Sequence, residues 1–231
     1  MIVFDVNETL SDLGPIAQRF ASLGLPPQLA QTWFAQVLRD GFALAATGDS
    51  ASFSTIAAGV LHAVLAAHAR HRDSDAAVRH VLEGFMSLEV HPDVPEGVRA
   101  LDDAGLRLVT LSNGATDVAE ALLTRAGVRD RFERLLSVQD APLWKPAPAS
   151  YAYVARTCEV SPEDMLLVAV HPWDVHGAAR AGLRTAWVTR HEGAPYPSYF
   201  TEPDMMVTGV DDLARQLAAS HPPPAGAEGR T

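Results

Sequence analysis

Cysteine, lysine and long apolar runs are scarce in this chain of 231 residues. Cys158 is its single cysteine, so no intramolecular disulfide can form, and its apolar helical surroundings predict a buried thiol without a chemical role. The apolar stretches are far shorter than a bilayer span, and the sequence opens on a strand pattern instead of a charged and hydrophobic leader. We therefore expect a cytoplasmic protein without a membrane span.

Basic side chains are also few. The sequence holds 18 Lys and Arg against 28 Asp and Glu, a formal net charge of -10, and shows no basic stripe. Such a surface repels nucleic acid and anionic membranes, so we expect neither as a partner. The apolar content of 48% is typical of a globular protein with one sizeable core and room for an inserted module.

From residue 91 onward, apolar runs alternate with helical periodicity. Strands are expected over residues 106–111, 135–138, 166–170 and 185–188, and helices over residues 94–104, 116–126, 149–158 and 175–181. Together with the apolar run at residues 2–4, this alternation predicts an α/β fold. Its core is a doubly wound, Rossmann-like parallel sheet with helices on both faces.

Residues 13–92 follow a helical pattern throughout. Amphipathic helices are expected over residues 28–44, 53–69 and 76–86, with breaks at residues 48–50 and 71–74. This pattern predicts an all-helical insertion after the first strand. The expected divisions are an α/β core over residues 1–14 and 91–219, a helical cap over residues 15–90 and a flexible tail over residues 220–231.

Polar residues follow the expected strands. Asp5 comes directly after residues 2–4, Ser112 and Asn113 follow a second apolar run, and His171 follows a third. Because parallel strands present their last residues to the ligand crevice, these side chains are candidates for chemistry. A carboxylate in that place is a nucleophile, a metal ligand or a helix cap, and Ser-Asn-Gly is also an ordinary turn sequence.

Lys145 is the only lysine of the chain, since every other basic residue in the Lys and Arg count is arginine. It precedes Pro146, which favours an extended backbone. A fixed cation beside Asp5 would hold that carboxylate ionised and orient it as a nucleophile. The alternative is an ordinary surface lysine, and its isolation in an arginine-using chain favours the functional interpretation.

The order of Asp5, Ser112, Lys145 and Asp174 along the chain resembles the four-part signature of the haloacid dehalogenase superfamily, and the resemblance covers nearly the whole sequence. It implies the fold of that superfamily, with a mobile helical cap inserted after the first strand. It also implies that Asp5 is the nucleophile, Thr9 its supporting hydroxyl, Ser112 the substrate-binding hydroxyl and Lys145 the anchoring cation. The signature says less about the substrate.

Asn7 narrows the reaction class. Phosphatases of the superfamily carry a second aspartate two residues after the nucleophile, where it transfers protons, and an asparagine cannot do so. The chain therefore resembles the L-2-haloacid dehalogenase (type II) branch. That resemblance implies a small 2-substituted carboxylic acid as substrate, displacement of halide by Asp5 with inversion, hydrolysis of the aspartyl ester by water, no required cofactor, and a homodimer.

The same resemblance implies further site residues, with Asp174 positioning the water or Lys145. His171 joins the catalytic candidates because of its own chemistry, since an imidazole that titrates near neutral pH suits proton transfer. The implied substrate-binding residues are Asn7, Thr9, Ser112, Asn113, Tyr151 and Trp173. For Tyr151 and Trp173 the alternative is an aromatic residue of the core.

The sequence departs from the dehalogenase pattern at several places. Asn7 replaces an aromatic residue, His171 replaces an asparagine, and Ala169 replaces a serine. Phe34 stands where those enzymes carry a cap arginine, and Arg39 lies about 140° further round the same helix, which favours a surface position. His171 could activate the hydrolytic water or, when protonated, bind an anion; its alternative is a structural histidine at a strand end.

Three other interpretations stay open. The first is carbon–nitrogen cleavage, such as the ring opening of azetidine-2-carboxylate by a relative in this branch. The second is a magnesium-dependent phosphatase, with the metal held by Asp5, the carbonyl of Asn7 and Asp174. The third is a binding protein without activity, which the joint presence of Asp5, Ser112, Lys145 and Asp174 disfavours because a scaffold needs none of them.

Overall fold

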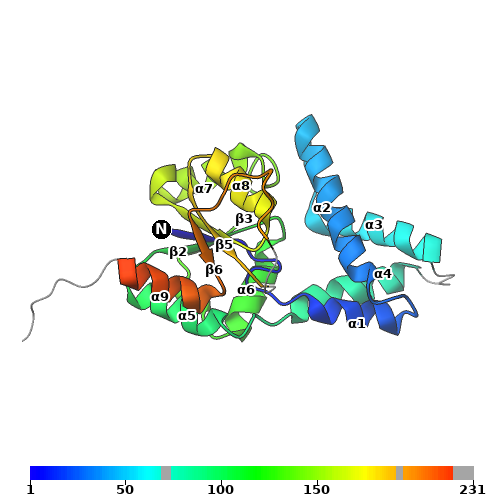
Figure 1. Ribbon diagram of the computed structural model, residues 1–231. Coiled ribbons are helices and arrows are strands. Elements are labelled where there is room, and N and C mark those ends of the chain that lie inside the picture. The colour runs from blue at the N-terminus through cyan, green and yellow to red at the C-terminus, as the bar shows by residue number, and fades with distance from the viewer. Residues whose placement is uncertain (69–73, 191–194, 221–231) are drawn as a thin grey trace, which may run out of the picture.

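The computed structural model describes residues 1–68, 74–190 and 195–220, so the predicted tail after Ser220 lies outside the described residues. Its centre is a six-stranded, all-parallel sheet in the order β3-β2-β1-β4-β5-β6 (Figure 1). The strands are β1 (Ile2–Phe4), β2 (Leu108–Ser112), β3 (Arg134–Ser137), β4 (Leu166–Ala169), β5 (Arg184–Val188) and β6 (Met205–Val207).

The two central strands explain why the apolar runs are continuous. Every residue of β1 and of β4 is buried, because helices cover both faces of the sheet. Ile2 pairs with Leu108 of β2 on one side and with Leu166 of β4 on the other. The strand order reverses between β1 and β4, and such a reversal opens a crevice at their carboxyl ends.

Helices cover both faces of the sheet (Figure 1). One face is covered by α5 (Val94–Asp103), α6 (Thr116–Arg125) and α9 (Val210–Ser220), and the other by α7 (Pro148–Cys158) and α8 (Pro172–Arg180). Two further segments, Arg129–Arg131 and Pro162–Asp164, form short 3-10 helices. The predicted doubly wound α/β fold is confirmed.

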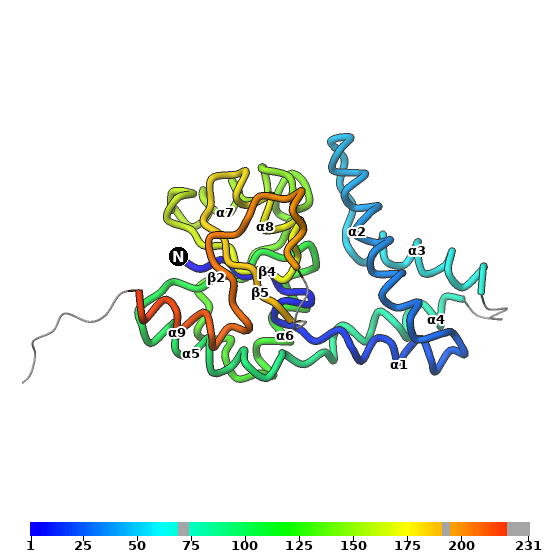
Figure 2. The backbone as a smooth tube through the Cα atoms, in the orientation of Figure 1, coloured from blue at the N-terminus to red at the C-terminus, as the bar shows by residue number. Residues whose placement is uncertain are grey.

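The predicted helical cap is also confirmed, although its exact limits stay a prediction. Between β1 and α5 the chain forms α1 (Gly14–Ser22), α2 (Leu29–Thr47), α3 (Phe53–His68), α4 (Ser74–Leu82) and a 3-10 helix (Glu83–Ser87). These helices stand beside the sheet as a separate group (Figure 2). Aromatic contacts join them to the core: Phe53 stacks on Trp144 at 6.2 Å between ring centroids, and Phe42 meets Trp173 edge-on at 4.8 Å.

The structure differs from the sequence-based prediction at a few elements. Helix α1 was not among the three expected cap helices, because it is short and begins at Gly14-Pro15, a pair typical of turns that also suits a first helical turn. Strand β6 and helix α9 were not predicted, and β6 is too short to show a strand pattern. Helix α8 begins at Pro172, not at residue 175, because proline fits the first helical position.

Two predictions about single features hold within the described residues. Cys158 is buried, and burial raises the pKa of its thiol, as expected for an unreactive cysteine. No helix in the described part of the chain combines the length and apolar character needed to cross a membrane.

Gly97 allows α5 and α9 to pack closely, because it has no side chain. A Cβ atom there would collide with the backbone nitrogen of Asp211 and the carbonyl carbon of Val210. Gly97→Ala must therefore displace backbone, and we expect a loss of about 1–3 kcal/mol in the free energy of unfolding. Urea denaturation measures it.

The matched control is Gly59→Ala on the exposed side of α3, where a Cβ atom would meet nothing within 4 Å. There the change should stabilise by about 0.5–1 kcal/mol, because alanine is the better helix former. Equal effects of the two substitutions would contradict the close packing of α5 on α9.

Candidate active site

The candidate active site lies at the carboxyl ends of the central strands. Asp5 follows β1, Ser112 ends β2, and His171 and Asp174 lie at the start of α8, which follows β4. Lys145 reaches the same place from the loop between β3 and α7. The reversal of strand order between β1 and β4 thus brings these residues, distant in sequence, to one crevice.

Asp5 is almost fully buried, at 3% exposure, and both of its carboxylate oxygens accept hydrogen bonds. Oδ1 accepts from the Lys145 ammonium at 2.8 Å. Oδ2 accepts from the hydroxyl of Thr9 at 2.6 Å and lies 3.2 Å from Nδ1 of His171. Thr9 is fixed in turn, because its hydroxyl oxygen accepts from the backbone N–H of Val170 at 3.0 Å.

Lys145 is completely buried and is shared by two carboxylates. Its ammonium donates to Oδ2 of Asp174 at 2.6 Å as well as to Asp5. Oδ1 of Asp174 accepts from the Tyr151 hydroxyl at 2.6 Å. Asn113 holds the lysine backbone: its side-chain oxygen accepts from the Lys145 N–H at 3.0 Å, and its amide nitrogen donates to the Lys145 carbonyl at 3.4 Å.

These contacts determine the charges in the crevice. Burial acts to raise the pKa of Asp5, but the charge of Lys145 and the hydrogen bond from His171 outweigh it and hold this pKa well below its ordinary value. Burial raises the pKa of Asp174 despite the contact with Lys145. Burial acts to lower the pKa of Lys145, but Asp174 and Asp5 raise it. Asp5 is therefore an ionised carboxylate beside a permanent cation.

His171 is a second cation of the site. Its Nε2 lies 2.8 Å from Oε2 of Glu8, so the imidazole bridges Glu8 and Asp5. Burial acts to lower the pKa of His171, but the hydrogen bonds to Asp5 and Glu8 raise it to about 9. The ring is therefore protonated at neutral pH, and of the two roles expected for it, activation of water as a base is not supported.

A small cavity of about 90 Å³ opens beside Asn7 and Ser112, between the core and the cap. Its walls are mainly apolar, with Phe53 and Phe85 from the cap and Val118 from α6 among them. The Ser112 oxygen accepts from the N–H of Gly114 at 2.9 Å, and no acceptor for its own hydrogen is found among residues 1–68, 74–190 and 195–220. The hydroxyl is thus available to bind an anionic oxygen.

The other predicted residues lie near the site in different ways. Tyr151 is fully buried and donates to Asp174, and the side chain of Asn113 bonds to the backbone of Lys145. Both residues therefore support Lys145 and its partner instead of facing the apolar cavity. Trp173 stacks on His171 at 5.0 Å between ring centroids and touches Phe42 of the cap. It therefore links His171 to the cap, and its role as a wall of the substrate site stays a prediction.

Several site residues were not predicted. Glu8 adopts a left-handed backbone at φ 61°, which no sequence pattern marked. Phe42, Phe53 and Phe85 belong to the apolar cap pattern, and only the fold shows that they cover the crevice. Arg39 is at the surface as expected, paired with its neighbour Asp40 and 67% exposed in its side chain.

The carboxylates do not fit a magnesium site. The Lys145 ammonium already bridges Asp5 and Asp174, at 2.8 Å and 2.6 Å, so another cation holds the place between the two carboxylates that a shared Mg²⁺ would need. Within the described residues no group of three or more His, Cys, Asp or Glu side chains could hold a metal ion. The phosphatase interpretation, with Asp5 and Asp174 as ligands, therefore finds no support in the donor set.

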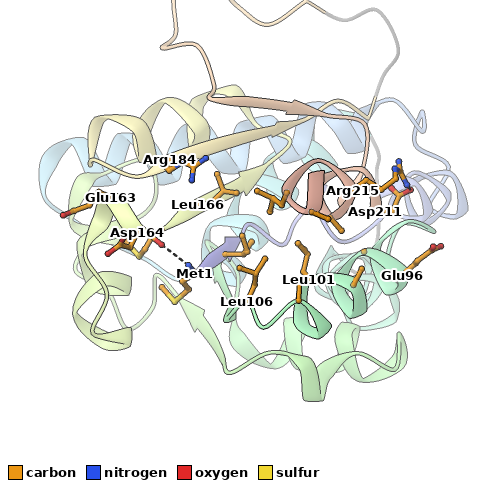
Figure 3. A pocket seen from close by; sticks show the side chains of 18 residues that line it. Met1, Glu96, Leu101, Leu106, Glu163, Asp164, Leu166, Arg184, Asp211 and Arg215 are labelled. Atoms are coloured by element: carbon orange, nitrogen blue, oxygen red, sulfur yellow. Dashed lines mark hydrogen bonds and ion pairs between the residues drawn. The ribbon is translucent and has the colours of Figure 1, made fainter. Parts of the chain in front are cut away.

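A second cavity of about 740 Å³ lies at the opposite edge of the sheet (Figure 3). Leu101, Leu106 and Leu166 line its floor, and the terminal ammonium of Met1 donates to the carbonyl of Asp164 at 2.9 Å. It has the larger volume, but it lies at the amino ends of the strands, away from the buried charges. The crevice at Asp5 is the better candidate, because chemistry in such sheets occurs at the carboxyl ends.

Removal of the shared cation should damage the fold. Lys145→Met leaves two buried carboxylates without their common partner, and we expect a loss of about 3–5 kcal/mol in the free energy of unfolding at neutral pH. The loss should shrink as the pH falls, because the unpaired carboxylates take up protons more readily in the folded state than in the unfolded chain. Urea denaturation at several pH values measures both effects.

Arg39→Met serves as the control, since it also removes one cation but from an exposed pair. It should leave stability almost unchanged. A Lys145→Met protein as stable as the parent would show that the three buried charges do not depend on one another.

Comparisons with known proteins show which family this chain resembles. The model of the haloacid dehalogenase-like hydrolases matches residues 1–182. Haloacetate dehalogenase H-2 from Moraxella sp. (strain B) is 34% identical over 146 residues, 63% of this chain and 64% of that protein. The (S)-2-haloacid dehalogenase from Pseudomonas sp. (strain YL) is 28% identical over 222 residues, 90% of each chain.

Solved structures show the same architecture. The L-2-haloacid dehalogenase from Xanthobacter autotrophicus with chloropropionic acid covalently bound superposes with a TM-score of 0.84 at 28% identity, covering 94% of this chain and 97% of that one. The superfamily predicted from Asp5, Ser112, Lys145 and Asp174 is thereby confirmed. Because the family model spans most of the sequence, the chain belongs to the haloacid dehalogenase-like hydrolase family.

Proposed function

We propose that this protein hydrolyses a small 2-haloacid, with Asp5 as the nucleophile. The observation that carries the proposal is the buried, ionised carboxylate of Asp5, held by Lys145, Thr9 and His171 at the carboxyl end of β1. The position two residues later holds Asn7, which cannot protonate a leaving group. A halide needs no proton to leave, so this site suits carbon–halogen cleavage.

In the first step, an oxygen of Asp5 attacks C2 of the acid and the halide departs with the bonding electrons. The free hydroxyl hydrogen of Ser112 binds the substrate carboxylate, and Asn7 lines the same cavity. The volume of about 90 Å³ suits a small acid such as a haloacetate or 2-halopropionate. Attack from the side opposite the halide inverts C2.

In the second step, water attacks Cγ of the aspartyl ester. Asp174, which the Lys145 ammonium joins to Asp5 at 2.6 Å and 2.8 Å, accepts the water proton, and burial, which raises its pKa, suits it to that role. Lys145 and Tyr151 hold Asp174 in place at 2.6 Å each. Asp5 is restored and the product is the 2-hydroxy acid. No residue of this scheme requires a cofactor or metal.

The relatives support this chemistry. Several similar proteins are (S)-2-haloacid dehalogenases, and one solved relative carries chloropropionic acid bound covalently. We therefore propose an (S)-2-haloacid as substrate. As in the expectation from the sequence, the proposed assembly is a homodimer.

A second candidate reaction is carbon–nitrogen cleavage of a strained ring such as azetidine-2-carboxylate. The observation that favours it is the surface position of Arg39 together with Phe34 at the cap, which leaves no arginine of α2 at the crevice. His171, as the protonated imidazole, could then donate a proton to the leaving nitrogen. Ring opening of azetidine-2-carboxylate compared with halide release from 2-chloropropionate distinguishes the two reactions.

The proposed nucleophile is tested with (S)-2-chloropropionate. We expect the parent to release chloride and to form the hydroxy acid of inverted configuration, and Asp5→Asn to lose at least about 10³-fold in kcat. Chloride release and chiral chromatography measure these outcomes. A stably folded Asp5→Asn protein with parental turnover, freshly prepared so that it cannot revert by deamidation, would rule the nucleophile out.

The proposed substrate-binding hydroxyl is tested separately. Ser112→Ala removes a hydrogen bond to a charged group, for which about 1.5–3 kcal/mol is typical, so KM should rise about tenfold or more while kcat changes less. Ser137→Ala is the control, because that hydroxyl donates to the carbonyl of Gly114 and not to the cavity. An unchanged KM for Ser112→Ala would contradict its role.

A further inference from the structure

We propose that Glu8 is a positioning residue which keeps His171 in its cationic form, so that His171 and Thr9 together bind the ester carbonyl oxygen of Asp5 during hydrolysis. This inference rests on the proposed function and adds to it. It assigns a role to Glu8, and it replaces the expected base function of His171 by electrostatic stabilisation of an oxyanion.

The two oxygens of Asp5 differ in their partners. Oδ2 is close to two fixed donors, the Thr9 hydroxyl at 2.6 Å and the His171 ring at 3.2 Å, while Oδ1 contacts the Lys145 ammonium at 2.8 Å. Oδ1 has the greater free lone-pair capacity, so it is the attacking atom. Oδ2 then becomes the carbonyl oxygen of the ester, where negative charge develops when water adds to Cγ.

His171 is held from its far side by Glu8. The 2.8 Å contact at Nε2 aims Nδ1 at Asp5, and Trp173 stacks on the ring at 5.0 Å between centroids. Because Glu8 is an anion and Asp5 loses its charge when it becomes an ester, Glu8 is the partner that can stabilise the imidazolium in the second step. In a protein without Glu8, formation of the ester would leave the His171 imidazolium without an anionic partner. The ring would then lose its proton more readily in the step in which it must bind the oxyanion.

The backbone of Glu8 supports this role. Its φ of 61° is left-handed, a conformation that costs most residues free energy and favours glycine or asparagine. The residue is fixed there by its N–H, which donates to the Ser11 hydroxyl at 3.3 Å, and by its carbonyl, which lies 3.1 Å from Nε2 of His91. A side chain at this strained position points to a specific need for its carboxylate.

A cavity of about 370 Å³ adjoins this pair and is lined by Glu8 and His171. The other titratable or charged groups on its walls are Asp12, His91 and Arg190. Burial lowers the pKa of His91, which therefore adds no competing cation at neutral pH. Arg190 is paired with Asp93 at 2.5 Å and donates to the carbonyl of Thr9 at 2.6 Å, so its charge has an anionic partner of its own.

The reaction balances with these groups. Oδ1 bonds to C2 as the halide leaves with its electron pair, and water then adds to Cγ while one water proton passes to Asp174. The carbonyl electron pair moves onto Oδ2, where Thr9 and His171 bind it. Collapse breaks the bond between Cγ and Oδ1, the product alkoxide takes the proton from Asp174, and Asp5 releases the remaining proton to solvent. The net products are the 2-hydroxy acid, halide and one proton.

Glu8→Gln tests the proposal, because glutamine can still accept the hydrogen bond from Nε2 but carries no charge. In the free parent enzyme Asp5 and Glu8 together raise the pKa of His171 to about 9. Esterification removes the charge of Asp5, so hydrolysis of the ester should decline at a pH below about 9 but above the ordinary imidazole value, where His171 loses its proton. In Glu8→Gln the decline should move to lower pH, toward the ordinary imidazole value of about 6.5. At pH values above this decline, Glu8→Gln should hydrolyse the ester up to about 10²-fold more slowly than the parent, whereas the burst of chloride release should change much less.

The direct readout is intact-mass spectrometry of the enzyme during turnover of (S)-2-chloropropionate, which separates the two steps. Alkylated Asp5 should accumulate in Glu8→Gln at pH values above the lowered decline in hydrolysis. His171→Ala, which removes both the donor and the charge, should accumulate the ester at every pH and show no such pH dependence. Glu89→Gln is the matched control, since that glutamate is 67% exposed and pairs with Arg125, and it should behave as the parent.

A Glu8→Gln protein whose ester hydrolysis declines at the same pH as in the parent, and which accumulates no ester, would overturn the role of Glu8 and His171. Alkylated Asp5 in the parent would still support the proposed function. Absence of the ester from every protein, including a parent quenched during its first turnover, would overturn the proposed nucleophile and this inference with it. The two failures are therefore distinguishable in one set of spectra.

Discussion

The buried ammonium of Lys145 is the interaction on which the site depends. It joins Asp5 at 2.8 Å to Asp174 at 2.6 Å, and all three groups are removed from water. Burying such charges costs several kcal/mol each unless they are paired with good geometry. The pairing is complete only when β1, α8 and the loop before α7 have docked, so the fold and the catalytic charge arrangement form together.

Topology explains why these charges meet. The sheet reverses its strand order between β1 and β4, and the residues that follow those strands enter the same crevice. The cap then covers it with aromatic rings, through Phe42 on Trp173 and Phe53 on Trp144. Exclusion of water strengthens each electrostatic contact inside, which benefits a mechanism that depends on the carboxylates of Asp5 and Asp174 and on the cations of Lys145 and His171.

The sequence predicted the parts of the site that follow from local pattern. Apolar runs that end in polar residues identify strand ends, and from these Asp5, Ser112 and Asp174 could be named before the fold was known. The unique lysine made Lys145 a candidate by contrast with the arginines. Parallel strands with helical crossovers left little choice of architecture.

Other features depend on contacts that no local pattern contains. The pairing of Glu8 with His171 joins residues 163 positions apart. The raised pKa of His171 arises only because two carboxylates meet its ring in the folded chain, which is why a base role was a reasonable but unsupported expectation. Asn113 was expected to bind substrate, and only the fold shows its amide on the backbone of Lys145.

The most direct test of the account is a single turnover in water enriched in heavy oxygen, with enzyme in excess over (S)-2-chloropropionate, followed by mass spectrometry of the peptide that contains Asp5 and of the product. Attack by Asp5 predicts that the label enters the Asp5 carboxylate and that the hydroxy acid of this first cycle carries ordinary oxygen. Label found in the product and not in Asp5 would mean that water attacks the substrate directly, and would contradict the account.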